Sequence, residues 1–179
     1  MRDKQESDFD NIGDNRSELA DALHKRLRNK GIDFATGVPC GVLKYVIRNI
    51  EEDRDIIHVP ANRESEAIGI AAGAFFSGKR SVIYMQNSGL FSASNDIASL
   101  LVPYKIPILF LVSHRGCKGE DAIQHQVTGR GTEVLLRTLG LSYVTIDKLN
   151  MVSSHDTVFR TMIATSLPFV LLFRRGWSK

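Results

Sequence analysis

The chain has 179 residues, of which 43% are apolar, enough for one domain with a buried core. Its formal net charge is +3, and its basic and acidic residues are interspersed, which argues against a nucleic-acid-binding surface. No apolar run approaches the roughly 18 residues of a membrane span. The two cysteines lie far apart and form no CxxC pair, as expected of a protein in the reducing cytoplasm.

The predicted elements alternate between helix and strand after a polar beginning. Residues 1–16 are polar and charged, and we expect a disordered leader there, followed by one domain at residues 17–179. Leu19, Leu23 and Leu27 recur at four-residue spacing, which predicts a helix that Gly31 can end. Further helices are predicted near 42–50, 67–74, 94–101, 133–139 and 155–165. Strands are predicted at 32–35, 56–59, 81–85, 108–112, 143–146 and 169–173.

Apolar strands separated by helices indicate an α/β fold with a parallel sheet covered on both faces. We therefore expect a three-layer sandwich around a six-stranded, mainly parallel sheet. In such sheets ligands bind beyond the carboxyl ends of the strands. Four loops follow strands there: 37–41, 60–66, 86–90 and 113–129. The last is longer than ordinary connections, which is typical of a functional or disordered segment.

Motifs for several common chemistries are absent from this sequence. No GxGxxG follows a strand, no GxxxxGK[ST] occurs and Ser88 is not in a GxSxG turn, which disfavours a flavodoxin-like nucleotide binder. Gly69 and Gly73 are best explained by close helix packing. The five histidines lack metal-ligand spacing, so no metal site is expected. Glu64 and Glu66 precede an apolar helix, where carboxylates favour the helix dipole; from spacing alone they are structural or functional.

Three stretches carry a resemblance to a known family: GVPCGVL at 37–43, ANRESEAIGIAAGAFFSGK at 61–79 and MQNSGL at 85–90. Together they resemble the pyrimidine-binding domain of sulfopyruvate and phosphonopyruvate decarboxylases, which are thiamine-diphosphate enzymes. QHQVTGRGT at 124–132 and PFVLLFRRG at 168–176 fit in the same order, so the resemblance covers residues 19–176. It implies a carboxy-lyase that converts sulfopyruvate to sulfoacetaldehyde and CO₂. The alternatives are phosphonopyruvate decarboxylation to phosphonoacetaldehyde and a non-catalytic interaction domain that keeps the fold.

The resemblance also assigns residues to the cofactor. Glu64 matches the catalytic glutamate that hydrogen-bonds the aminopyrimidine N1′ and favours its imino tautomer, a form of acid–base assistance. Glu66 stays with the dipole interpretation. The cofactor-binding residues implied are Pro39, Glu64, Gln86, Asn87, Ser88 and Gly89.

The substrate side of the site is implied by the later motif. Gln124 and His125 match a polar pair that faces the substrate in related decarboxylases, and His125 is the candidate acid there because Gln124 cannot titrate. Arg115 and Lys118 are candidates to hold a sulfonate or phosphonate, or are simply solvated. Ile123 stands where members of the family often carry Pro, which leaves the course of the loop open.

The resemblance implies that a second chain completes the site. Members of the family hold the diphosphate through Mg²⁺ with a GDG motif and a downstream Asn, and this sequence contains no GDG. We therefore expect a beta subunit to bind Mg²⁺ and the diphosphate, while this chain binds the pyrimidine and no metal. The expected assembly is a hetero-oligomer with two-fold symmetry.

Overall fold

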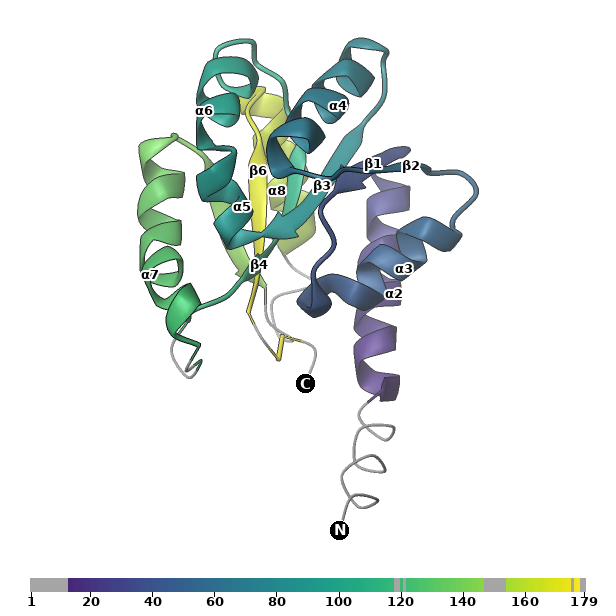
Figure 1. Ribbon diagram of the computed structural model, residues 1–179. Helices are drawn as coiled ribbons and strands as arrows, with labels where there is room; N and C mark the ends of the chain where they lie inside the picture. Colours follow the sequence, from purple (N-terminus) through teal and green to yellow (C-terminus); the bar gives the residue numbers. More distant parts are fainter. Residues whose placement is uncertain (1–12, 118–119, 121, 147–153, 175, 178–179) are drawn as a thin grey trace.

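A six-stranded sheet forms the centre of the computed structural model, which describes residues 13–117, 120, 122–146, 154–174 and 176–177. Every neighbouring pair is parallel, and the strand order is β2-β1-β3-β4-β6-β5. The strands are β1 (Phe34–Gly37), β2 (Ile57–Pro60), β3 (Ser81–Gln86), β4 (Leu109–His114), β5 (Ser142–Ile146) and β6 (Phe169–Arg174). The predicted six-stranded α/β sandwich is confirmed, and the sheet is parallel throughout (Figure 1).

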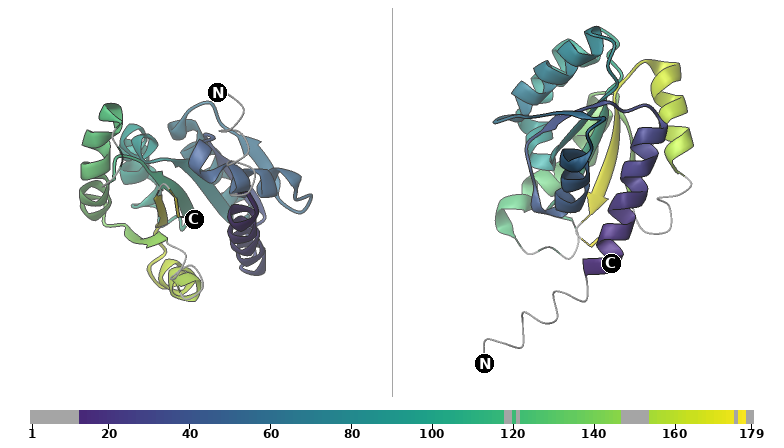
Figure 2. Two further views of the ribbon diagram at one scale, coloured as in Figure 1. Left: turned by 90° about the horizontal axis from the view of Figure 1, so that it is seen from below. Right: turned by 90° about the vertical axis from the view of Figure 1, so that its right-hand side faces the viewer.

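Helices cover both faces of the sheet and give the three layers seen edge-on in the right-hand view of Figure 2. One face packs against α2 (Gly13–Asn29), α3 (Lys44–Glu52) with its preceding 3₁₀ turn (Gly41–Leu43), and α8 (Ser154–Thr165). The other face packs against α4 (Glu64–Phe76), α5 (Asn87–Ser92), α6 (Ser94–Asp96), a π-helical turn (Ile97–Leu101) and α7 (Ile123–Thr138). Each face therefore has its own hydrophobic core.

The two cores follow from strand alternation. In β3, Val82 and Tyr84 pack toward α2 and α3, whereas Ile83 and Met85 pack toward α4 and α5. Successive strand residues point to opposite faces, so a strand buried on both sides must be apolar throughout. The edge strand β2 departs from this pattern, because Ile57 is 50% exposed.

Helix α7 corrects the prediction of a long loop at 113–129. β4 runs on to His114 and α7 already begins at Ile123, so the connection shrinks to residues 115–122. Two glycines and several polar residues hid the helix, since glycine disfavours helix interiors. The structure explains one of them: a Cβ on Gly129 would lie 2.2 Å from the Gly116 carbonyl oxygen. Tertiary contact thus overrides local propensity.

Two helices begin earlier in the sequence than predicted. The predicted loop at 86–90 is short, because α5 begins at Asn87 directly after β3. The helix α2 begins at Gly13 and so includes the last four residues of the predicted leader; residues 1–12 lie outside the described part of the chain. In the described part, no helix has the length and apolar character needed to cross a bilayer.

The Gly69 and Gly73 pair differs from its predicted role. Both residues are exposed on α4, and a Cβ added to either would meet no atom within 4 Å. Close packing against another helix of the described chain therefore does not account for them.

Candidate active site

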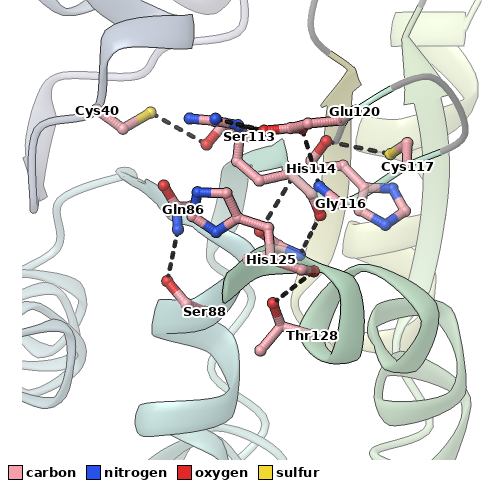
Figure 3. Close-up of polar contacts among 12 residues, drawn as sticks. Cys40, Gln86, Ser88, Ser113, His114, Gly116, Cys117, Glu120, His125 and Thr128 are labelled. Carbon is pink, nitrogen blue, oxygen red and sulfur yellow. Dashed lines mark hydrogen bonds and ion pairs between the residues drawn. The ribbon is translucent and has the colours of Figure 1, made fainter. Parts of the chain in front are cut away.

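The site lies at the carboxyl edge of the sheet, where β1, β3 and β4 end side by side. Gly37 pairs with Tyr84, and Gln86 pairs with Ser113, so the loops that follow these strands are neighbours. The Cys40 thiol donates to Ser113 Oγ at 3.1 Å, which links the loop after β1 to the end of β4 (Figure 3). The topology thus gathers the segments that carry the predicted site residues.

Glu64 is the first residue of α4, and its side chain lies against Gly89 on α5. A Cβ on Gly89 would fall 2.4 Å from Glu64 Cγ and 2.6 Å from Glu64 Oε1. Only glycine leaves room for the carboxylate in this position. Two predicted cofactor residues, 25 positions apart in the sequence, are therefore in direct contact. Glu64 remains partly exposed, so its carboxylate is open to a ligand.

Glu66 has a different environment two residues later. Its Oε2 accepts a hydrogen bond from the Asn62 backbone N–H at 2.8 Å, and the side chain is exposed. This bond ties the carboxylate to the backbone just before Arg63, the N-cap of α4, which is a local structural role for a carboxylate in a first helical turn. The geometry agrees with a structural interpretation of Glu66.

Asn87 joins three segments of the edge and is fully buried. Its Nδ2 donates to the Arg115 carbonyl at 3.0 Å and to Thr132 Oγ1 at 2.9 Å, while its Oδ1 accepts from the Arg115 N–H at 3.1 Å. These bonds occupy both amide hydrogens and the carbonyl oxygen. The side chain of Asn87 therefore holds α5, the end of β4 and α7 together, and does not face the open side of the site.

Gln86, Ser88 and His125 present polar groups on the open side. Gln86 Nε2 donates to Ser88 Oγ at 2.8 Å, which orients the Gln86 amide, and both residues are partly exposed. The His125 ring projects from the first turn of α7 toward Gln86 (Figure 3). The His125 carbonyl accepts from Thr128 Oγ1 at 3.2 Å within that turn. An amide and an imidazole thus face the same space.

Arg115 is not a free cation, because it forms an ion pair with Glu120 through Nε and Nη2. Glu120 also accepts from the Gly116 N–H at 2.9 Å, and its side chain is only 4% exposed. The hydrogen bonds from Arg115 and Gly116 hold the pKa of the Glu120 carboxyl below its ordinary value, against the opposing effect of burial. The charge of Arg115 is therefore largely compensated before any substrate arrives.

The remaining predicted residues lie at the rim. Pro39 and Gln124 are exposed, Pro39 in the loop after β1 and Gln124 in the first turn of α7. Lys118 lies outside the described residues. The sequence reasoning missed Glu120 and Thr132, which fix the loop and α7 in place. Glu120 lies outside the quoted motifs and Thr132 closes the motif at 124–132 without a role assigned to it, and only the fold brings them to their partners.

The residues present fit one half of the implied cofactor. A carboxylate beside a glycine gives a ring both a hydrogen-bond acceptor and close backbone approach, and the Gln86 amide adds a polar group. Nothing comparable exists for a hard cation: within the described ranges, no group of three His, Cys, Asp or Glu could hold a metal. The arrangement suits proton sharing with an aromatic nitrogen base.

Comparisons with known proteins identify the family of the chain. Residues 17–133 match the family model "Thiamine pyrophosphate enzyme, N-terminal TPP binding domain". The sulfopyruvate decarboxylase subunit alpha of Methanococcus maripaludis is 42% identical over 69% of this chain and 74% of its own length. That of Methanothermobacter thermautotrophicus is 44% identical over 72% and 78%. The phosphonopyruvate decarboxylase of Streptomyces viridochromogenes is 32% identical over 84% of this chain but 38% of its own length.

Proposed function

We propose a decarboxylase function from one premise: the chain belongs to the thiamine pyrophosphate enzymes, through their N-terminal TPP binding domain. It acts as the alpha subunit of a sulfopyruvate decarboxylase, which releases CO₂ from sulfopyruvate and forms sulfoacetaldehyde. Relatives named as subunit alpha of a sulfopyruvate decarboxylase match at 42–46% identity, and those named phosphonopyruvate decarboxylase match at 31–32%. One relative named sulfopyruvate decarboxylase, without a subunit label, matches at 27%.

The observation that carries the proposal is the contact between Glu64 and Gly89. It holds a carboxylate at the carboxyl edge of the sheet, at the position where the family motif has its catalytic glutamate. Glu66, the neighbouring candidate, accepts a hydrogen bond from the Asn62 backbone N–H, which is a structural role. These different contacts support the assignment of Glu64 over Glu66, which spacing alone left open.

The chain's own residues bind and polarise the pyrimidine half of thiamine diphosphate. When bound, the cofactor supplies a thiazolium carbon that attacks the ketone and accepts the electrons released with CO₂. Glu64 would hydrogen-bond the ring nitrogen of the aminopyrimidine and share its proton. Gly89 leaves room for the ring and the carboxylate together. His125, whose ring points toward Gln86 in Figure 3, is the residue that we propose donates a proton to the product.

The division of the site between two chains is the finer part of the proposal. This sequence contains no GDG, and no metal-ligating cluster occurs among the described residues. A beta subunit is therefore proposed to supply Mg²⁺ and the diphosphate contacts. The name "subunit alpha" of the relatives supports a partner. Two-fold symmetry and a cytoplasmic location stay predictions from the sequence.

Two alternatives have distinct signatures. A phosphonopyruvate decarboxylase subunit would turn over phosphonopyruvate faster than sulfopyruvate in a direct competition assay. A non-catalytic domain would bind the partner without turnover. The position of Glu64 against Gly89 argues for an active site, because a purely structural carboxylate has no need of that close approach.

The test compares Glu64→Gln with the matched control Glu66→Gln. Each variant is purified with the beta subunit, and exchange of the thiazolium C2 proton is followed by NMR, with the lone wild-type chain as a further arm. We expect Glu64→Gln to slow exchange by about 10²-fold or more, because Gln cannot share the proton. Glu66→Gln is expected to exchange at the wild-type rate and to lose less than about 1 kcal/mol of stability.

The outcomes separate the two levels of the proposal. Wild-type exchange in Glu64→Gln would mean that another group activates the cofactor. Full exchange in the lone chain would refute the division between subunits and leave the role of Glu64 intact.

A further inference from the structure

A second hollow opens at the carboxyl edge, beyond the ends of β4 and β6 and against α7. Its volume is about 370 Å³. Its polar lining consists of His114, Cys117, Arg130, Glu133, Arg137 and Arg174. None of the polar side chains assigned to the cofactor or the substrate belongs to it, so it is a separate cavity with its own chemistry.

The charge of this lining is positive. Arg137 lies 3.8 Å from Glu133 and donates to the Tyr143 hydroxyl at 3.1 Å, so the one carboxylate is already engaged. Among the described residues, no carboxylate lies within ion-pair distance of Arg130 or Arg174. The Cys117 thiol donates to the His114 carbonyl oxygen at 3.1 Å, and burial raises the pKa of that thiol, so it offers no compensating charge.

A buried histidine borders the cavity and can report on its occupancy. His114 is 4% exposed, and its Nε2 lies 2.9 Å from the Gly129 carbonyl oxygen. Because a carbonyl only accepts, Nε2 carries the proton and Nδ1 presents a lone pair. Among the described groups, Nδ1 is buried with no hydrogen-bond partner, so it calls for a donor such as water and is not itself a contact for an anion.

A layer of backbone separates this cavity from the cofactor site. A Cβ on Gly116 would lie 1.9 Å from the His125 carbonyl oxygen, and one on Gly129 would lie 2.2 Å from that of Gly116. The loop and α7 therefore touch through their main chains. In Figure 3 the His125 ring and Gln86 lie on one side of Gly116, and His114 and Cys117 lie on the other.

We propose that this cavity is a binding site for a small tetrahedral oxyanion, either free as sulfate or phosphate or as the sulfonate end of a small molecule. Guanidinium groups present planar pairs of N–H donors that match such oxygens. Arg174 extends from the end of β6 and Arg130 from α7, so a bound oxyanion joins the sheet to the helix. It thereby fixes the helix whose first turn carries His125. The site does not depend on the proposed decarboxylase function.

The experiment is a titration of the full chain at constant ionic strength. Sodium sulfate, phosphate and ethanesulfonate are each added to the ¹⁵N-histidine-labelled protein, and the His114 ring signals are followed by NMR alongside calorimetry. Arg174→Gln and Arg130→Gln remove one charge each from the cavity. Arg54→Gln removes one from an exposed turn elsewhere and serves as the control.

We expect saturable binding that shifts the His114 signals. Each cavity variant should weaken it by about 10-fold or more, since a charge-assisted hydrogen bond is lost. Arg54→Gln should bind as the wild type does. Equal affinity in the cavity variants and the control, or no saturation with any of the three anions, would overturn the proposal. Binding of ethanesulfonate as well as sulfate assigns the site to a sulfonate end group, and binding of inorganic anions alone assigns it to the free ion.

Discussion

Gly89→Ala is the substitution that most directly tests the geometry of the site. The new methyl group would start 2.4 Å from Glu64 Cγ and 2.6 Å from Oε1. An ordinary carbon contact is about 3.5 Å, so the Glu64 side chain must move by about 1 Å. It can do so by rotating, because the atoms that it would strike belong to a flexible side chain and not to backbone.

The expected effects on stability and on rate therefore differ. Alanine gains about 0.8–1.0 kcal/mol of helix propensity over glycine, and displacing a side chain from its rotamer costs about 0.5–1.5 kcal/mol. The two nearly cancel, so the free energy of unfolding should change by less than about 1 kcal/mol. A misplacement of about 1 Å at a catalytic group, by contrast, can cost about 10²-fold in rate, which corresponds to about 2.7 kcal/mol of barrier.

The assay is sulfopyruvate decarboxylation by the chain assembled with the proposed beta subunit, with urea unfolding measured on the same preparations. Gly131→Ala is the matched control, because its methyl group would meet Phe91 Cζ at 2.9 Å, away from Glu64. We expect the control to keep its turnover even where its stability falls. Wild-type turnover in Gly89→Ala would refute the argument that this contact positions the catalytic carboxylate.

Two further predictions concern the loop and α7. Gly129→Ala places a methyl group 2.2 Å from the Gly116 backbone oxygen, which cannot rotate away, so we expect a loss of about 1–3 kcal/mol in urea unfolding; an unchanged midpoint would contradict this. Glu120→Gln should cost about 1–3 kcal/mol at pH 7. Because the folded-state pKa of Glu120 is depressed, this contribution exists above its ordinary pKa of 4.5 and disappears as pH falls through the folded-state pKa. A difference from wild type that is equal at pH 7 and pH 3 would count against the ion pair.

The strands were predictable because strands buried on both faces consist of continuous runs of apolar residues. The run at 108–112 places β4 within two residues of its observed ends. The strand continues to Ser113 and His114, which are polar yet buried, so hydropathy could not extend it. Strand order was not predictable from local pattern, since it depends on which face each crossover helix covers.

The candidate site likewise has features that the local sequence indicates and features that depend on the tertiary structure. The motif singles out Glu64 as a candidate, but the contact of Glu64 with Gly89 joins positions that no spacing rule connects. The sequence makes Arg115 a candidate substrate cation and does not reveal its ion pair with Glu120. Glu120 lies in an irregular loop, where no helical or strand periodicity predicts pairing. The roles of Asn87 and Gly129 required the tertiary structure, since both act by holding distant segments together.

The meeting of Gly116 and Gly129 also limits how this protein can vary through mutation. Each position excludes a side chain because the other contributes main chain, so a second substitution at the partner cannot rescue the first. The backbone of Gly116 also has a φ of +77°, a conformation that disfavours any residue other than glycine. Gln126 and Val127 are exposed on the same helix and escape this restriction. Sequence drift near the substrate is therefore expected to pass through those neighbours while the two glycines stay fixed.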